Sequence, residues 1–258
     1  MSEGADAYRP DEIALRVEAA GVAKARMGLQ QMLALSVLAG AFIGFGAALW
    51  LVAMTGADPD FGPHRVLGGL VFSLGLILVV LGGAELFTGN ALMVMAVVDG
   101  RISGAEMLRA WGIVWLGNLA GAAGLALAFW PTGLLTGGLS ETVVRVAEGK
   151  AALGPVEAFS RGVLCNALVC LAVWLSIGAR TAAGKLLAVL WPVTAFVALG
   201  LEHSVANMFL FPMGFLAGAD ISAWAVAQNL WWVSLGNVAG GAGGVALAYR
   251  FAFHGGQA

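Results

Sequence analysis

The chain is poor in charged side chains. Only 11% of its 258 residues are Asp, Glu, Lys or Arg, whereas 60% are hydrophobic and the mean hydropathy is +0.89. This composition excludes an ordinary soluble domain. The formal net charge is −2, and the sequence has no basic patch that would meet phosphates, so a nucleic-acid partner is excluded as well.

Histidine and cysteine are also scarce, with three and two residues respectively. Cys165 and Cys170 lie in one apolar segment with no histidine nearby, which predicts buried thiols and not a metal site. The sequence contains no His-Glu-x-x-His run and no Ser–His or paired-aspartate arrangement. We therefore expect no metal, no cofactor and no catalytic residue, which disfavours an intramembrane enzyme.

Long apolar stretches are what the chain has in abundance. A membrane-spanning helix needs about 20 apolar residues, and six stretches meet this length. They cover residues 29–54, 66–98, 107–130, 157–178, 186–217 and 224–252. The sequence therefore predicts an all-α integral membrane protein with six transmembrane helices at 29–252, a cytoplasmic N-terminal amphipathic arm at 1–28 and a cytoplasmic tail at 253–258.

Lysine and arginine divide unequally between the two sides of such a protein. If the N-terminus is cytoplasmic, nine of them fall on cytoplasmic segments: Arg9, Arg16, Lys24, Arg26, Arg101, Arg109, Arg180, Lys185 and Arg250. Four fall in outer loops: Arg65, Arg145, Lys150 and Arg161. Because positive residues favour the cytoplasmic side, both termini are predicted to be cytoplasmic.

Two polar motifs occur twice within these apolar stretches. Glu85-Leu-Phe-Thr-Gly-Asn90 returns 117 positions later as Glu202-His-Ser-Val-Ala-Asn207, and Leu116-Gly-Asn returns 119 positions later as Leu235-Gly-Asn. The halves at 29–130 and 157–252 would each hold three spans, an odd number, so the second half enters the membrane from the opposite side. The sequence therefore predicts two inverted repeats, which are typical of transporters with a site at the repeat interface.

The second and fifth stretches are too long for one straight crossing. We expect each helix to break near its Glu-x-x-x-x-Asn motif, at Gly82, Gly83 and Gly89 in the first copy and at Gly200 in the second. Irregular backbone at this depth is tolerated where it lines a cavity, and helix ends facing a cavity suit an anion. Thr88 or Asn90 would cap the resumed first helix, and Ser204 the second.

Two kinds of polar side chain lie at these breaks. His203 is the one intramembrane histidine, and imidazole can offer an N–H or a charge to a small anion; a purely structural histidine is the alternative. We expect Glu85 and Glu202 to accept hydrogen bonds from the broken backbone or from the opposite repeat, together with Asn90 and Asn207 in a structural polar network.

Three segments carry a resemblance to a known family. Gly83-Ala-Glu-Leu-Phe-Thr-Gly-Asn90, Arg161-Gly-Val-Leu-Cys-Asn-Ala-Leu-Val-Cys-Leu-Ala-Val-Trp174 and Gly200-Leu-Glu-His-Ser-Val-Ala-Asn-Met208 resemble the formate/nitrite transporter family. The resemblance covers nearly the whole chain. It implies an aquaporin-like fold and a homopentamer with one pore per protomer in the bacterial cytoplasmic membrane.

The resemblance also implies roles for individual residues. His203 matches the family's central pore histidine, Thr88 the threonine of the loop that breaks the second helix, and Asn166 the amide that hydrogen-bonds near the histidine. Lys150 resembles the vestibule lysine, although a solvated loop charge is an equal alternative. Apolar constriction positions are matched by Phe72, Leu76, Leu86 and Phe196; for Phe72 and Leu76 ordinary helix packing is the alternative.

The implied function is a channel or transporter for small monovalent anions, formate or nitrite, with pH-dependent proton coupling through His203. Protonation would remove the desolvation penalty of a bare anion in a low-dielectric pore. Some motifs resemble nitrite-type members of the family and others resemble formate-type members, so the sequence does not single out one anion. A hydrosulfide channel of the same family and a water or neutral-solute channel are the alternatives.

Pro10-Asp-Glu and the apolar period after it predict a helix in the arm. This helix either gates the pore or lies passively on the membrane surface.

Overall fold

The computed structural model describes residues 7–58 and 60–254, and every regular element in this part of the chain is helical. In chain order the elements are α1 (Pro10–Ala25), α2 (Leu29–Met54), α3 (Gly62–Phe72), α4 (Leu74–Gly82), η1 (Gly89–Met93), α5 (Val94–Val98), α6 (Gly104–Phe129), η2 (Trp130–Thr132), α7 (Gly137–Ala151), α8 (Pro155–Gly178), α9 (Ala182–Ala198), α10 (Ser204–Ala217), α11 (Ala223–Val238), η3 (Ala239–Leu247) and α12 (Ala248–His254). The first six residues of the predicted arm and the last four of the predicted tail lie outside the described residues.

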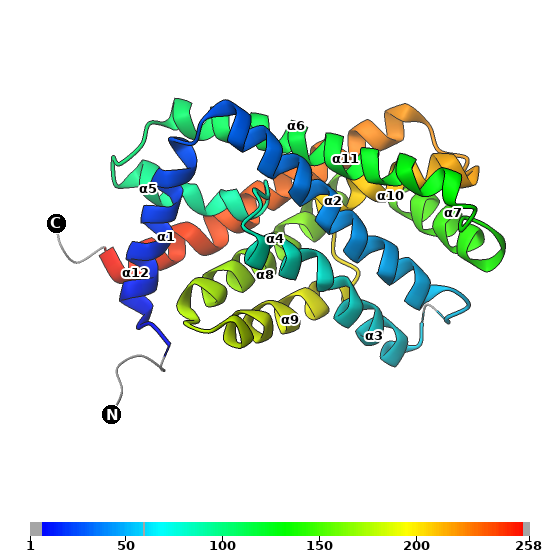
Figure 1. Ribbon diagram of the computed structural model, residues 1–258, viewed down its shortest axis with the longest axis horizontal. Helices are drawn as coiled ribbons and strands as arrows, with labels where there is room; N and C mark the ends of the chain where they lie inside the picture. Colours follow the sequence, from blue (N-terminus) through cyan, green and yellow to red (C-terminus); the bar gives the residue numbers. More distant parts are fainter. Residues whose placement is uncertain (1–6, 59, 255–258) are drawn as a thin grey trace.

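The helices form an elongated bundle. Figure 1 shows α1, α5 and α12 at one end and α7 at the opposite end. Within the bundle α2 packs against α6, α8 packs against α11 and α9, and α3 packs against α9. Among the described residues, four helices are long and apolar enough to cross a membrane, at Leu29–Met54, Gly62–Gly82, Gly104–Thr132 and Pro155–Gly178. Shorter apolar helices follow at Ala182–Ala198 and Ser204–Ala217.

Several helices begin where a short polar side chain accepts a backbone N–H. Ser103 accepts from Glu106 at the start of α6, Thr181 from Gly184 at the start of α9, and Ser222 from Ala225 at the start of α11. Such caps satisfy N–H groups that have no partner inside the helix. They fix where these apolar helices begin after each connecting loop.

Two glycines let helix pairs cross in direct backbone contact. A Cβ placed on Gly121 of α6 would lie 1.9 Å from the backbone oxygen of Val37 in α2, and a Cβ on Gly240 would lie 2.0 Å from the backbone oxygen of Val163 in α8. No side chain fits at either position. Small residues at such crossings are typical of helices packed within a membrane.

Both predicted helix breaks are present. The helix α4 ends at Gly82, Gly83 takes a left-handed φ of 73°, and regular structure resumes only at Gly89. In the second half α9 ends at Ala198, Gly200 takes the same φ of 73°, and α10 begins at Ser204. A left-handed glycine after a helix end is a common terminator, so the matched glycines end the two helices in the same way.

Two features differ from the sequence prediction. Residues 137–151, expected in an outer loop, form α7, because Thr142, Val143 and Ala147 are buried and give the helix a buried face. The sixth apolar stretch is interrupted by the π-helical turns of η3, which fall in a run rich in glycine. The predicted helix of the arm is present as α1, which packs against η1, α5, α8 and α12.

Candidate functional site

Asn118 of α6 holds the first helix break in place. Its Oδ1 accepts the backbone N–H of Phe87 at 2.9 Å, and its Nδ2 donates to the backbone oxygens of Ser36 and Glu85 at 2.7 and 2.9 Å. Asn118 is fully buried. One neutral amide thus satisfies backbone groups that the broken helix leaves without partners, as buried backbone requires.

Asn237 of α11 repeats this arrangement at the second break. Its Oδ1 accepts the backbone N–H of Ser204 at 2.9 Å, and its Nδ2 donates to the backbone oxygens of Gly162 and Glu202, both at 2.9 Å. Sequence analysis identified the two Leu-Gly-Asn motifs only as marks of the repeat and missed this role. Their recurrence at nearly the same offset as the Glu-x-x-x-x-Asn motifs was the available signal.

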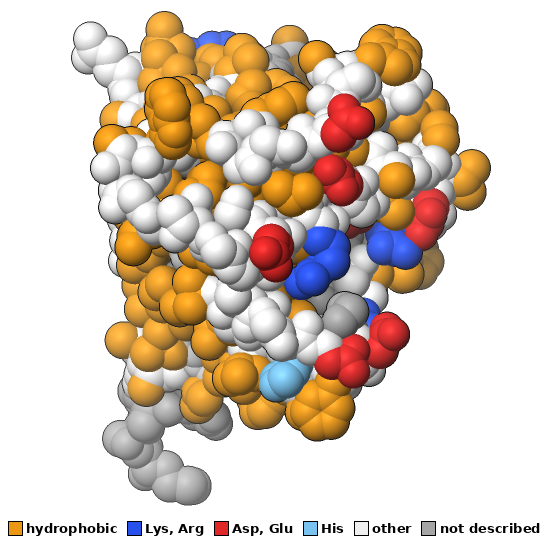
Figure 2. All heavy atoms as spheres, turned by 90° about the vertical axis from the view of Figure 1, so that its right-hand side faces the viewer, with side chains coloured by type: hydrophobic (Ala, Val, Ile, Leu, Met, Phe, Trp, Pro, Cys, Tyr) orange, Lys and Arg blue, Asp and Glu red, His pale blue; other side chains and the backbone are white. Residues whose placement is uncertain are grey.

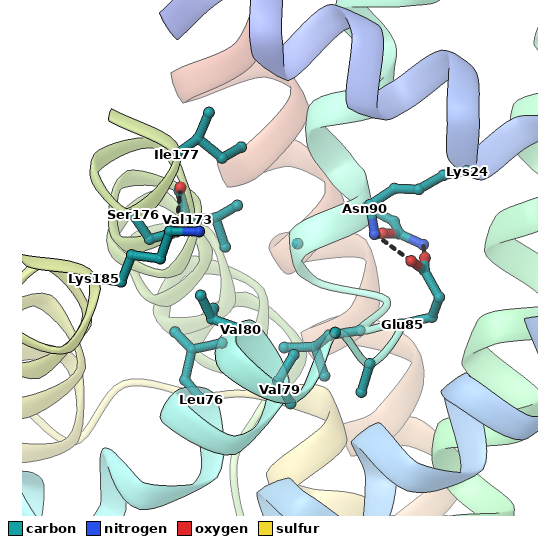
Figure 3. Close-up of a pocket in the computed structure, with 14 residues that line it drawn as sticks. Lys24, Leu76, Val79, Val80, Glu85, Asn90, Val173, Ser176, Ile177 and Lys185 are labelled. Atoms are coloured by element: carbon teal, nitrogen blue, oxygen red, sulfur yellow. Dashed lines mark hydrogen bonds and ion pairs between the residues drawn. The ribbon is translucent and has the colours of Figure 1, made fainter. Parts of the chain in front are cut away.

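Glu85 lies at the first break on the α1 side of the bundle. Its carboxylate accepts a hydrogen bond from Lys24 Nζ at 2.6 Å and another from Asn90 Nδ2 at 3.0 Å. Figure 3 shows Lys24 and Asn90 converging on Glu85 from two different elements. The arm helix α1 therefore contributes a positive charge to this site.

Glu202 has the matching partners at the second break, on the α7 side. Its carboxylate accepts from Lys150 Nζ and from Asn207 Nδ2, both at 2.7 Å. Glu85 and Glu202 thus form the expected polar network with Asn90 and Asn207, whereas the expectation that the two carboxylates accept hydrogen bonds from the broken backbone was wrong. A buried carboxylate needs a counter-charge, whereas a break needs both a donor and an acceptor, which only the amides supply.

His203 and Thr88 bring the two breaks into contact. The Nε2 of His203 lies 3.0 Å from Thr88 Oγ1, and both side chains are buried, with 3% and 1% exposed. The Nδ1 of His203 accepts the backbone N–H of Ala206 at 3.1 Å. Because Nδ1 accepts, the proton of the neutral ring is on Nε2, which donates to Thr88.

The N-cap predictions were therefore wrong in both copies. The cap of α10 is His203 and not Ser204, and the side chain of Thr88 makes no cap contact at the start of η1. The reason is geometric: the extended backbone at His203 directs its ring back to the first turn of α10. Thr88 directs its hydroxyl to the histidine instead.

Asn166 of α8 links the first break to the second half of the chain. Its Nδ2 donates to the backbone oxygen of Thr88 at 3.1 Å and to that of Asn237 at 2.6 Å. Asn166 is fully buried. It therefore holds Thr88, the partner of His203, and has no hydrogen bond to the histidine itself among the described residues.

The predicted constriction residues fall on two sides of this contact. The rings of Phe72 and Phe196 meet edge to face with centroids 5.7 Å apart, and Phe196 stacks on His203 at 5.8 Å. Both rings line a cavity on the α7 side, whereas Leu76 and Leu86 line a cavity on the α1 side. All four side chains are buried.

The α7-side cavity has a volume of about 420 Å³. Its charged and polar lining consists of Arg145, Lys150, Arg161, Glu202 and His203. Figure 2 looks onto this end of the molecule, where acidic and basic side chains gather near the middle of the face. Lys150 lies in the last turn of α7 with 15% of its side chain exposed, which disfavours a solvated loop charge.

The α1-side cavity has a volume of about 230 Å³. It is lined by apolar residues together with Lys24, Glu85, Asn90, Ser176 and Lys185. Figure 3 shows Lys24 and Lys185 on opposite walls of this cavity, with Leu76 and Val79 at its base. Two lysine-bearing cavities thus approach the His203–Thr88 contact from opposite ends of the bundle.

A sequence profile of the formate/nitrite transporter family matches residues 11–251 of the chain. The chain belongs to this family. It is 36% identical over 267 residues to the formate channel FocA of Escherichia coli strain K12, with 95% of this chain and 94% of FocA covered. It is 37% identical over 222 residues to the nitrite transporter NirC of the same organism, with 84% and 81% covered.

The fold agrees with that of solved family structures. A pentameric formate channel with formate bound superposes with a TM-score of 0.80 at 35% identity, covering 88% of this chain and 98% of that chain. This member of the formate/nitrite transporter family is accordingly an all-helical, multi-pass membrane protein. The family consists of anion channels and transporters, so the chain is a transport protein and not an enzyme.

Proposed function

We propose that the protein conducts small monovalent anions, formate or nitrite or both, with proton coupling at His203. The observation that carries this proposal is the position of the His203–Thr88 contact, at 3.0 Å, between two lysine-lined cavities that open toward opposite ends of the bundle. A lysine in each cavity attracts a charged substrate, and the apolar partition between the two cavities lets it cross with little water.

The path begins in a cavity whose basic side chains concentrate anions. Lys150, Arg145 and Arg161 line the α7-side cavity, and Lys24 and Lys185 line the other. Positive charge in a cleft with low-dielectric walls raises the local concentration of anions. The rings of Phe72 and Phe196 and the side chains of Leu76 and Leu86 then exclude a hydrated ion.

His203 is the polar contact within the partition. Its Nε2–H, which Thr88 accepts in this structure, is the donor that a formate or nitrite oxygen would meet. A bare anion loses most of its hydration here. A proton that enters with the anion from the water of the cavity and binds the anion's oxygen, while the His203 ring stays neutral, converts it to the neutral acid and lowers the barrier. Protonation of Nδ1 would break the cap on Ala206, which favours the neutral ring as the resting state.

The same proposal includes an inverted repeat with six spans, both termini in the cytoplasm of a bacterial inner membrane, and a homopentamer. The matched roles of Asn118 and Asn237 support the repeat. The positions of α1 and α7 at opposite ends of the bundle support the inversion (Figure 1). The pentameric assembly of the similar formate channel supports a homopentamer. The distribution of lysine and arginine supports cytoplasmic termini.

Substrate choice is tested by competition in proteoliposomes that contain the full-length protein. We expect formate and nitrite each to compete with labelled formate, lactate to compete weakly, and water permeability to stay near that of empty vesicles. Hydrosulfide that competes more strongly than either anion would support a hydrosulfide channel. Water flux without formate flux would contradict the proposal.

The constriction gives a second prediction, on selectivity. Replacing Phe72 by leucine removes a ring that packs on Phe196, so larger anions should pass. The ratio of lactate flux to formate flux should rise about tenfold, since a pocket resolves one methylene by about 1–3 kcal/mol. Leu175→Ala, on the exposed surface of α8, is the matched control; an equal rise in both variants would exclude a specific role for Phe72.

A further inference from the structure

On the α7 side, four side chains, that of Lys150 among them, form a ring of hydrogen bonds that closes at the backbone of Lys150. Lys150 Nζ donates to Glu202 Oε1 at 2.7 Å, and Asn207 Nδ2 donates to Glu202 Oε2 at 2.7 Å. Asn207 Nδ2 also donates to Asn229 Oδ1 at 2.8 Å, and Asn229 Nδ2 donates to the backbone oxygen of Lys150 at 2.9 Å. Through Asn207, Asn229 thus links the backbone of Lys150 to the Glu202 carboxylate that binds the Lys150 ammonium.

The corresponding network on the α1 side is open. Lys24 and Asn90 contact Glu85 as Lys150 and Asn207 contact Glu202. The position that corresponds to Asn229, at the offset of the two Leu-Gly-Asn motifs, is Ala110, which has no hydrogen-bonding side chain. The side chain of Lys24 is 29% exposed, against 15% for Lys150.

We propose that Asn229 is a positioning residue that fixes Lys150 at the α7-side cavity, where its charge captures the anion. This inference rests on the proposed function. Asn229 is 2% exposed and does not line the cavity, so it acts through Lys150 and not on the anion. A lysine ammonium sits on a flexible four-carbon stem, and a fixed backbone and a fixed counter-ion together confine it.

Confinement has a consequence for transport. A held ammonium keeps its charge beside the cavity that leads to His203, and Arg145 and Arg161 add charge to the same lining. Without Asn229 the backbone at the end of α7 and the side chain of Asn207, which holds Glu202, each lose a hydrogen bond. The Lys150 charge is then averaged over more positions. Anion capture from this side should weaken, whereas the step at His203 and Thr88 should not change.

The experiment compares Asn229→Leu, which keeps the branched shape without the amide, and Asn229→Ala with the wild type. Initial rates of formate uptake are measured in right-side-out vesicles, so that the α7 side faces the substrate in the proposed orientation. We expect KM to rise about three- to tenfold, because a charged cleft concentrates its counter-ion, with the maximal rate within about twofold. Ser234→Ala is the control on the same helix as Asn229: it removes the hydrogen bond that Ser234 accepts from Trp115 of α6 and should leave KM unchanged.

A double variant separates positioning from general damage. In a Lys150→Ala background, Asn229→Leu should produce no further rise in KM, because the residue it positions is absent. Independent effects of the two substitutions, or a fall in the maximal rate with KM unchanged, would overturn the proposal.

A chemical readout on the wild type tests the ring of hydrogen bonds without a transport assay. An acetylating reagent for amines is applied to the detergent-solubilised wild type, and modification of Lys150 and Lys24 is followed by mass spectrometry. The closed ring predicts that Lys150 reacts several-fold more slowly than Lys24, and that Asn229→Leu removes this protection where the variant assembles. Equal rates in the wild type would contradict the ring, whereas protected Lys150 in a protein that carries neither formate nor nitrite would contradict only the proposed function.

Discussion

Replacing His203 by asparagine is expected to lower formate flux by about 10- to 100-fold, since a hydrogen bond to a charged group contributes about 1.5–3 kcal/mol. Asparagine is the informative substitution because it is itself a favourable N-cap. It can keep the contact that His203 Nδ1 makes with the N–H of Ala206 while removing the Nε2 donor. The measurement is formate flux into proteoliposomes at several pH values on both sides of neutrality, so that the supply of protons to the pore changes.

The pH profile distinguishes the pore role from a structural one. Coupling at His203 predicts that the remaining flux loses its pH dependence, which a damaged helix cap alone would not produce. Thr88→Ser is the matched control, because it keeps the hydroxyl that lies 3.0 Å from Nε2, and it should retain both flux and profile. Wild-type flux with an unchanged profile in His203→Asn would contradict proton coupling at this residue.

The sequence predicted the helix breaks because their causes are local. Gly83 and Gly200 each lie two positions before the glutamate of a Glu-x-x-x-x-Asn motif, and both take the left-handed conformation that glycine tolerates. The helix α7 was missed because only one face of it, with Thr142, Val143 and Ala147, is buried, and a helix with a single buried face has no long apolar run. Its burial depends on the position of α10, which local sequence does not specify.

The residues at the helix breaks were predicted more fully than the contacts between them. His203 and Thr88 were expected to be the central pair, and the 3.0 Å contact places them together. The partners of Glu85 and Glu202 were not predicted, because Lys24 and Lys150 lie 61 and 52 positions away along the chain. Contacts of this range depend on how whole helices dock, and no motif spacing encodes them.

The second large effect concerns the amides that hold the breaks. Asn237→Leu should destabilise the protein by about 3 kcal/mol or more, since a buried polar group left unpaired costs about 1–3 kcal/mol. Three backbone groups each lose a hydrogen bond at once, the N–H of Ser204 and the oxygen of Glu202 at the break and the oxygen of Gly162 inside α8. The melting temperature of the purified protein in detergent, followed by tryptophan fluorescence, should fall by about 6–12 °C.

The repeat supplies the controls for this substitution. Asn118→Leu removes the same three kinds of contact at the first break and should lower the melting temperature by a similar amount. Leu235→Ala, two positions from Asn237 on the exposed surface of α11, should shift it far less. A melting temperature unchanged in both asparagine variants would mean that other contacts, and not the two amides, hold the breaks in place. Water cannot replace the amides at this depth, so a large loss in both is the outcome that the geometry requires.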